Sequence, residues 1–410
     1  MRKLFRIFCL PDRAFAFLLL GALSISFRVY AAPNVIAWGA GKIINPSDGN
    51  DYGQSIVPGN LTNAVFASGG WSHSLAVNSN GTLRGWGDDS LNQTDFFPSN
   101  ADYVTISCGY LHSLALRTNG TIAVAGGDFF GQIDVPSNLS NAVIVAVASG
   151  WYHSLALKSD GTVAAWGAGS NTNSSGTNPN YNQAVVPPGL SNVVAISGGG
   201  YHSLALISDG TVRAWGLNDN GQGQVPPGIS NVIAIAAGGA HNMVLKADGT
   251  VVCWGLNTYG ETNVPAGLSN VVAIAAGGWH NLALKSDGTV VAWGAGSGSN
   301  PNVDYHQNAV PAGLTNVVQI AAGLVHSLAI TNSTGLGLNA AMVESARGSN
   351  SFTVSIPTRN GRVYQMEYKN SLDDASWSPV FPLRAGNGGL QQLIDTNAYS
   401  TTRFYRIRQW

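Results

Sequence analysis

Charged residues are scarce in this sequence. Asp, Glu, Lys and Arg make up only 10% of its 410 residues, against about a quarter in an ordinary globular protein. The formal net charge is −1. The chain therefore has no positive field to attract nucleic acid and no acidic tail, so we expect no nucleic-acid partner.

Glutamate and cysteine are also rare, which limits the available chemistry and crosslinks. Glutamate occurs only at Glu261, Glu344 and Glu367, so the close acid pair that glycoside hydrolysis requires is missing. A phosphate-binding Gly-Lys-Ser/Thr loop is missing too. Cys108 and Cys253 fall in different repeats, so we expect two small core residues and no disulfide between them.

One pattern recurs through most of the chain before residue 336, and its clearest copy is GGWHNLALKSDGTVVAWG at residues 277–294. Each copy has a histidine three residues after a glycine. These histidines are His73, His112, His153, His202, His241, His280 and His326. Most copies end in a Trp–Gly pair, but the second has Ala125–Gly126. Self-similarity at one period indicates a repeat architecture.

Each copy predicts a set of short antiparallel strands. Apolar and polar residues alternate on both sides of an Asp-Gly or Asn-Gly pair such as Asp287–Gly288. This predicts a hairpin with a type I′ turn, in which both central residues have positive φ. A Val-, Ile- and Ala-rich segment before each histidine predicts a third strand. Such a unit cannot bury its apolar faces alone, so a period of about 40 residues predicts a β-propeller.

The two ends of the repeat region are incomplete and complementary. Residues 34–41 (NVIAWGAG) have a Trp–Gly half without a histidine half, whereas the copy around His326 has a histidine half only. Together they predict one composite blade, which brings the total to seven. Pairing the two halves also removes an open sheet edge. We expect an all-β chain with a seven-bladed β-propeller over residues 32–336.

The flanking segments differ from the repeats. Residues 1–31 combine Arg2, Lys3 and Arg6 with an apolar run and a small-residue site, which predicts a cleaved secretory signal peptide. An uncleaved anchor is the alternative, although the run is short for the roughly 20 residues of a membrane span. Residues 337–410 lose the repeat marks and alternate like strands, so we expect a small β-sandwich-like C-terminal domain.

Seven histidines at one repeat position raise the question of a metal or catalytic site. Equivalent positions in neighbouring blades should lie on the order of 10 Å apart, whereas the ligands of one ion lie about 2 Å from it. We therefore expect no metal, no cofactor and no catalytic residue. The alternative that we favour is a partly buried histidine bonded to backbone carbonyls in each blade.

The informative variation lies in the two positions before each histidine. Large aromatic side chains occur there, and these loops should gather at one end of the ring. The rings could pack between blades, or they could form an aromatic collar that binds a partner. The candidate collar residues are Trp71, Tyr110, Trp151, Tyr152, Tyr201 and Trp279.

Three long linkers, at residues 40–57, 168–186 and 295–310, leave the same point of the repeat. They share an Asn/Ser/Gly-rich composition and a Tyr before a Gln. We expect them to cluster on one face, either as solvated loops or as part of a binding rim.

The pattern GG-x-H-S/N-LALK-x-DG-x-V-x-AWG…GQ…VP closely resembles the regulator of chromosome condensation repeat family over residues 33–333. The resemblance implies a seven-bladed propeller closed by a shared blade. Within that family, the pattern is most similar to secreted bacterial members that inhibit β-lactamases, whose aromatic residues before the His–Ser position contact the partner. It implies the same role for the collar residues, although Ala240 and Val325 depart from this pattern and residues 337–410 are additional. The guanine nucleotide exchange of nuclear members is only a remote family label for an exported, nearly neutral chain.

Three functions remain open. The chain could be an exported, non-enzymatic scaffold that binds an extracellular or envelope protein through one propeller face. It could instead bind carbohydrate, since Trp, Tyr and Asn also suit sugar faces. It could also be a structural cell-envelope protein anchored by its C-terminal domain. In each case we expect a secreted or envelope-bound monomer without a membrane span after signal cleavage.

Overall fold

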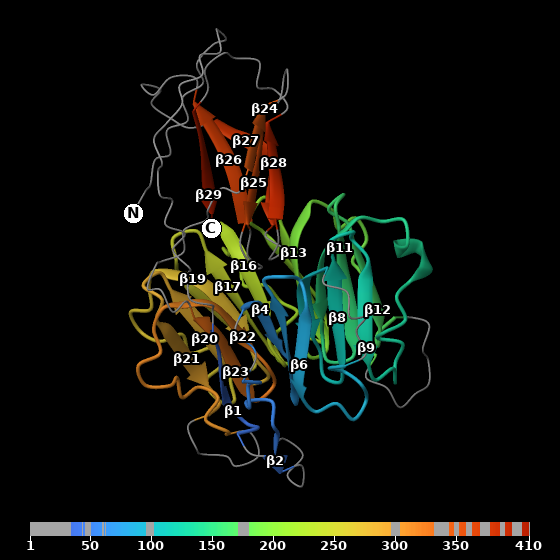
Figure 1. Ribbon diagram of the computed structural model, residues 1–410, viewed down its shortest axis with the longest axis vertical. Coiled ribbons are helices and arrows are strands. Elements are labelled where there is room, and N and C mark those ends of the chain that lie inside the picture. Colours follow the sequence, from blue (N-terminus) through green and yellow to red (C-terminus); the bar gives the residue numbers. More distant parts are fainter. Residues whose placement is uncertain are drawn as a thin grey trace, which may run out of the picture.

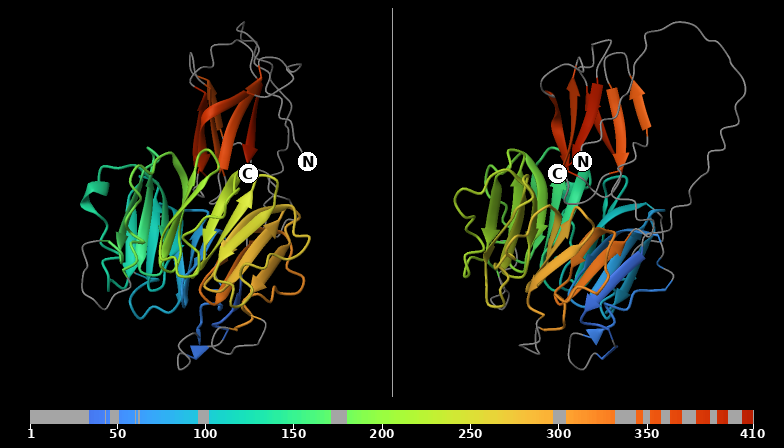
Figure 2. Two further views of the ribbon diagram at one scale, coloured as in Figure 1. Left: turned by 180° about the vertical axis from the view of Figure 1, so that it is seen from behind. Right: turned by 90° about the vertical axis from the view of Figure 1, so that its left-hand side faces the viewer.

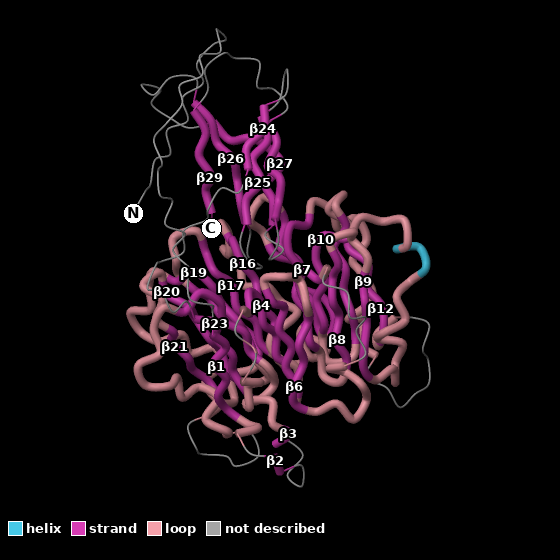
Figure 3. Tube along the Cα trace, viewed as in Figure 1, coloured by secondary structure: helices cyan, strands magenta, loops and turns pink. Residues whose placement is uncertain are grey.

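The computed structural model describes residues 34–42, 44–45, 51–59, 61, 63–95, 102–170, 180–296, 304–331, 344–347, 352–357, 363–369, 378–385, 390–395 and 404–409. Strands dominate this part of the chain, and Figure 3 shows in cyan the short 3-10 turn η2 (Ser137–Leu139). The predicted signal peptide and the boundary between residues 336 and 337 lie outside the described residues. The described residues contain no helix that is long and apolar enough to cross a membrane.

The described repeat region forms seven three-stranded antiparallel sheets, as the repeat count predicts. In a representative blade, β10 (Ile144–Ser149) pairs with β11 (His153–Lys158), which pairs with β12 (Val163–Gly167). The stretch after each Trp–Gly pair consists mainly of turns. The other complete blades are β4 (Ala64–Gly69), β5 (His73–Asn78) and β6 (Leu83–Gly87); β7 (Tyr103–Cys108), β8 (His112–Arg117) and β9 (Ile122–Gly126); β13 (Val193–Gly198), β14 (His202–Ile207) and β15 (Val212–Gly216); β16 (Val232–Ala237), β17 (His241–Lys246) and β18 (Val251–Gly255); β19 (Val271–Ala276), β20 (His280–Lys285) and β21 (Val290–Gly294).

The ring closes through the composite blade. The N-terminal β1 (Asn34–Gly39) pairs antiparallel with β23 (His326–Thr331), and Gly39 lies opposite His326. The third strand of this blade is β22 (Val317–Ala322). In Figures 1 and 2 the first and last blades of the ring accordingly lie side by side. The prediction that two incomplete half-repeats form one sheet is confirmed.

The hairpin turns differ from the prediction. Gly161 has a φ of +79°, but the preceding Asp160 does not have positive φ. Gly161 N–H donates to the Lys158 carbonyl, and Lys158 N–H donates to the Thr162 carbonyl. This is a three-residue loop, a type I turn followed by a left-handed glycine, so the predicted type I′ turn is wrong.

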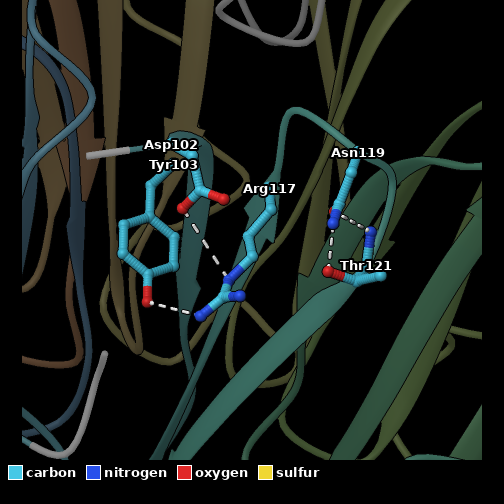
Figure 4. Close-up of polar contacts among 5 residues, drawn as sticks. All are labelled: Asp102, Tyr103, Arg117, Asn119 and Thr121. Carbon is cyan, nitrogen blue, oxygen red and sulfur yellow. Dashed lines mark hydrogen bonds and ion pairs between the residues drawn. The ribbon is translucent and has the colours of Figure 1, made fainter. Parts of the chain in front are cut away.

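Asp or Asn occupies the position before that glycine because its side chain closes the turn. Figure 4 shows it in the second blade, where Asn119 Oδ1 accepts hydrogen bonds from Thr121 N–H at 2.9 Å and Thr121 Oγ1 at 2.7 Å. Asp160 and Thr162 repeat the arrangement. The side chain closes the turn, which explains the choice of Asp or Asn. Beside this turn, Arg117 donates to the Tyr103 hydroxyl and pairs with Asp102.

The core consists of separate apolar layers between neighbouring blades. Leu155 and Leu157 of β11 project into the next blade, where they pack near Ala205 and Trp215. Ala156 of the same strand faces the preceding blade and packs against two leucines of β8. The middle strand of each blade thus presents large side chains to one neighbouring blade and small side chains to the other. Large side chains meet small ones at each interface, which allows close packing.

The repeated Trp residues occupy these layers, as expected, and also tie down the linkers. Trp166 Nε1 donates to the carbonyl oxygen of Gln132 at 3.0 Å. The second blade has Ala125 instead, and its layer contains two larger residues, Phe66 and Tyr103, among its buried members. Cys108 and Cys253 are free thiols, as predicted.

Near the C-terminus, the described strands form two further antiparallel sheets. One contains β24 (Glu344–Arg347), β25 (Phe352–Pro357) and β28 (Leu390–Asp395). The other contains β26 (Val363–Lys369), β27 (Ser378–Ala385) and β29 (Phe404–Gln409). Two three-stranded sheets agree with the expected sandwich-like region.

Candidate binding face

The seven repeated histidines form a hydrogen-bonded circuit between blades. Each ring is fully buried, with 0% exposure. Its Nε2 contacts the side chain that follows the histidine of the next blade. The pairs are His73–Ser113, His112–Ser154, His153–Ser203, His202–Asn242, His241–Asn281, His280–Ser327 and His326–Ser74, at 2.7–3.1 Å. The last pair joins the composite blade to the first, so the circuit closes.

The hydrogen-bond partners of the histidines show which ring nitrogen carries the hydrogen. Ser154 Oγ donates to the Gln132 carbonyl, so it accepts from His112 Nε2–H. Asn242 acts likewise, because its Oδ1 faces His202 while its Nδ2 donates to the Gln222 carbonyl. The seven Nδ1 atoms have no hydrogen-bond partner. Burial lowers the pKa of each ring to about 3 or 4, so all seven are neutral near pH 7.

This arrangement corrects one expectation. The histidines are not partly buried and are not bonded to backbone carbonyls by their rings; they link neighbouring blades through side chains. In the described residues, no three His, Cys, Asp or Glu side chains lie close enough together to hold a metal ion. The circuit is therefore a structural device, and it fixes the loop that precedes each histidine.

A second ring of bonds, between backbone groups, holds these preceding loops together. Tyr110 N–H donates to the Trp151 carbonyl at 3.3 Å, and Trp151 N–H donates to the Gly199 carbonyl at 3.2 Å. Similar bonds continue around the ring until Leu324 N–H donates to the Gly70 carbonyl. Each loop is braced by its neighbour, so the backbone of these loops is held in place.

The structure brings all six predicted collar residues together at one end of the channel. The central member is Trp151, whose ring centroid lies 5.8 Å from Tyr110, 5.2 Å from Tyr201 and 6.5 Å from Trp279. Trp71 stacks on Tyr110 at 4.1 Å. Tyr152 bridges Tyr110 and Tyr201, at 5.2 and 5.8 Å. We call this group the aromatic collar, and the end of the propeller that carries it the collar face.

The collar is separate from the layers between blades. Trp71, Tyr110, Trp151 and Trp279 pack around Leu324 and Val325 in their own cluster, and all six collar residues are partly exposed. Of the two interpretations of these rings, the geometry therefore matches the collar. Burial raises the pKa of Tyr152 and Tyr201 to about 12, which keeps both hydroxyls neutral.

Glycines on the next two blades make room for the central ring. A Cβ atom at Gly200 or Gly239 would lie 3.1 Å from the Trp151 indole. The indole thus lies across two backbones that have no side chain. Gly200 and Gly239 stand two positions before the histidine of their blades, where the third blade has Trp151. They provide the floor on which the Trp151 ring lies.

The linkers add aromatic residues that our prediction of the site did not include. Each linker has a buried Gln, or Glu261 in one case, whose side-chain oxygen accepts the N–H of the residue two positions before it. That residue is aromatic in five linkers: Tyr52, Phe130, Tyr181, Tyr259 and Tyr305. The repeated aromatic-x-Gln spacing was the available signal.

Several of these linker residues extend the collar outward. Phe130 meets Tyr152 edge to face at 5.1 Å, and Tyr181 meets Tyr201 at 5.5 Å. Tyr305 packs against the cluster around Leu324. Tyr181 is strongly exposed, at 40%, as is Phe129 beside Phe130, at 60%. The described parts of the long linkers therefore lie on the collar face, which agrees with the expectation that they cluster on one face.

Behind the collar, the inner strands enclose a channel. Its cavity of about 270 Å³ is lined by Ala, Ser, Gly and Ile side chains of β4, β7, β10, β13, β16, β19 and β22. A smaller cavity of about 70 Å³ follows, and it reaches Trp71, Tyr110 and Trp151. The collar thus covers one end of the channel, and the arrangement supplies a contact surface.

Comparison with known families identifies the repeat. Six segments match the regulator of chromosome condensation (RCC1) repeat, at residues 65–93, 103–132, 144–174, 193–222, 232–261 and 271–299. These correspond to the six complete blades. A comparison with curated proteins found no match.

Solved structures show the same architecture. The chain is similar to Prp20p from Saccharomyces cerevisiae, a protein with binding properties to Gsp1p and histones, with 20% identity and a TM-score of 0.58 over 76% of this chain and 93% of that one. It is also similar to human WBSCR16, with 22% identity and a TM-score of 0.55 over 74% of this chain and 100% of that one. At these identities the likeness shows the fold.

Proposed function

This chain belongs to the regulator of chromosome condensation repeat family, and from that premise we propose that it is an exported, non-catalytic protein that binds a protein partner through its collar face. The observation that carries the proposal is the aromatic collar itself. Six partly exposed rings gather on loops that are braced from blade to blade. Clustered Trp and Tyr residues supply much of the binding energy at protein interfaces.

The bracing supports binding as much as the composition does. Association is weakened when loops and side chains must be ordered on contact. Here the histidine circuit and the backbone ring fix the loops beforehand, and Trp151 already lies on its glycine floor. A preorganised surface of this kind avoids much of that entropic cost.

Carbohydrate binding is the second candidate, because exposed aromatic rings also stack on sugars. The orientation of the collar rings favours a protein partner over a carbohydrate. Tyr110, Tyr201 and Trp279 are inclined to Trp151 by 48°, 73° and 66°, so they form no common plane. Trp71 and Tyr110 also cover each other's faces. An irregular surface suits interlocking side chains better than the flat face of a pyranose.

The test is a double variant, Trp151→Ala with Trp279→Ala, used as bait against the culture medium and envelope fraction of the source organism. A matched control is Val143→Ala, since Val143 is 61% exposed and lies outside the collar, directly before β10. We expect the wild type and the control to capture the same protein and the double variant to lose it. Equal capture by all three would refute the collar. A glycan array with the same variants tests the second candidate.

Export rests on residues 1–31 and is tested separately, by N-terminal sequencing of the protein recovered from the medium. Anchoring by residues 337–410 is the structural alternative. A chain ending at residue 336 should then be released to the medium, and retention in the envelope would exclude that anchor. Guanine nucleotide exchange stays a family label, because an exported propeller would not meet a cellular GTPase.

A further inference from the structure

Carboxylates gather in the loops that border the collar. In five linkers, an aspartate lies three to five residues before the buried Gln. These residues are Asp51, Asp88, Asp89, Asp128, Asp219 and Asp304. Three of them directly precede an aromatic residue of the linker, in the pairs Asp51–Tyr52, Asp128–Phe129 and Asp304–Tyr305. Acidic and aromatic side chains therefore alternate along the same loops.

Backbone bonds hold the loops that carry these acids against the collar. Asp88 N–H donates to the Ser72 carbonyl at 2.8 Å, one residue from Trp71. Gly127 N–H, next to Asp128, donates to the Leu111 carbonyl at 2.8 Å, beside Tyr110. The same bond recurs in the other blades, for instance from Leu217 to the Tyr201 carbonyl. The proximity of acids and rings is therefore built into the repeat.

Positive charge is almost missing from these loops. Between each Trp–Gly pair and the next buried Gln or Glu, the described residues include one cation, Lys42. The ion pairs Arg117–Asp102, Lys246–Asp248 and Lys285–Asp287 lie near the hairpin turns. A chain with a net charge of only −1 thus places six aspartates and one lysine in the described loops around the aromatic rings.

This combination selects for cations. The face of a Trp or Tyr ring attracts an ammonium or guanidinium group, and neighbouring carboxylates strengthen that attraction. Arginine suits such a surface best, because its planar group stacks on rings and pairs with carboxylates. The same charges repel phosphate and sulfate, and so disfavour nucleic acid and sulfated glycans.

We propose that the partner segment that docks on the collar face is a basic protein loop whose arginine or lysine side chains lie on the aromatic collar and pair with the surrounding aspartates. This proposal rests on the proposed function, since it names the chemistry of the partner that the collar binds. It commits to a protein, and glycan binding is an outcome of the test.

The test begins with a random library of disulfide-closed peptide loops displayed on phage and selected on the full chain. Selected loops are then synthesised and their dissociation constants measured by calorimetry. We expect enrichment of arginine and lysine. Replacing the arginines of the best loop with citrulline, which keeps the shape and removes the charge, should weaken binding at least tenfold.

The protein supplies matched charge variants. Asp89 and Asp128 accept N–H groups through Oδ1, as Asn218 and Asn257 do in other blades. The triple variant Asp89→Asn, Asp128→Asn, Asp219→Asn should therefore keep its fold and weaken binding about tenfold, with the loss shrinking as salt rises. The control, Asp160→Asn, Asp209→Asn, Asp248→Asn, removes equal charge at hairpin turns, where Asn80 and Asn119 already serve, and should bind like wild type.

The outcomes separate the two proposals. Neutral or acidic loops that bind the wild type and fail on the Trp151→Ala, Trp279→Ala variant would leave protein binding standing and overturn the cationic partner. Equal binding by the two Asp→Asn triple variants would overturn it as well. Two other outcomes would refute the proposed function itself. In one, the enriched loops bind equally well to the wild type and to the Trp151→Ala, Trp279→Ala variant. In the other, no peptide loop is enriched and glycans bind at the collar.

Discussion

Mild acid should unfold the propeller, because its seven linking histidines are buried in the neutral form. Folding lowers their pKa from about 6.5 to about 3 or 4. A lowered pKa means that the unfolded chain binds protons first as the pH falls. The stability that these rings contribute is therefore complete above pH 6.5 and is lost progressively between about pH 6.5 and pH 4.

The expected loss is large because the effect repeats in every blade. Between pH 7 and pH 5.5, protonation of one unfolded histidine lowers the free energy of unfolding by about 1.2 kcal/mol, and seven together by roughly 9 kcal/mol. That is comparable to the whole stability of a typical domain, about 5–15 kcal/mol. The hairpin aspartates, whose pKa is lowered by bonds from threonines, lose their contribution only below about pH 4, outside this window.

The assay is urea unfolding, followed by circular dichroism, at several pH values between 7.5 and 5. The slope of unfolding free energy against pH gives the number of protons taken up, which should approach seven near pH 5. His280→Asn, which removes one ring of the circuit, should reduce this slope by about one. A stability independent of pH over this range would refute the reasoning.

Three further predictions concern single positions, each measured by urea unfolding. Glu261→Gln should stabilise the protein by about 1–2 kcal/mol at pH 8 and by less as the pH falls toward 4.5, because burial raises the pKa of this carboxyl above 4.5 and its ionisation costs stability as the pH rises; a destabilised variant would show that the acid is required. Ser74→Ala should cost about 1–3 kcal/mol by leaving His326 Nε2–H unpaired at the seam, and an unchanged midpoint would argue against the circuit. Gly161→Ala should cost about 1–2 kcal/mol because φ is +79°, while Asp160→Asn should cost far less.

Much of the fold followed from local pattern. The alternation around each Asp-Gly pair predicted the strands, and the spacing of the histidines predicted the blades. The incomplete copies at residues 34–41 and around His326 predicted the closing sheet, which the pairing of β1 with β23 confirms. The turn type was wrong because the same dipeptide fits two loops, and the choice depends on whether Asp160 or only Gly161 adopts positive φ.

The position of the aromatic cluster could be predicted from the sequence, but its organisation could not. Six aromatic residues near the histidines could be assigned to one end of the ring, because equivalent positions of a closed repeat share an end. The floor that Gly200 and Gly239 make for Trp151 could not be derived from the sequence. Nor could the aspartates be placed beside Trp71 and Tyr110, since that depends on how each linker folds back on its blade.

The sequence alone determined what repeats: strand periodicity, small inner residues, and the number and closure of the blades, because these follow from side-chain alternation and spacing along one segment. Tertiary structure decided what meets: each histidine with a serine or asparagine of the next blade, and carboxylates with rings on one face. The histidines and their partners lie about forty or more residues apart in the chain, so their contact depends on the rotation between blades, which only the closed and packed ring defines.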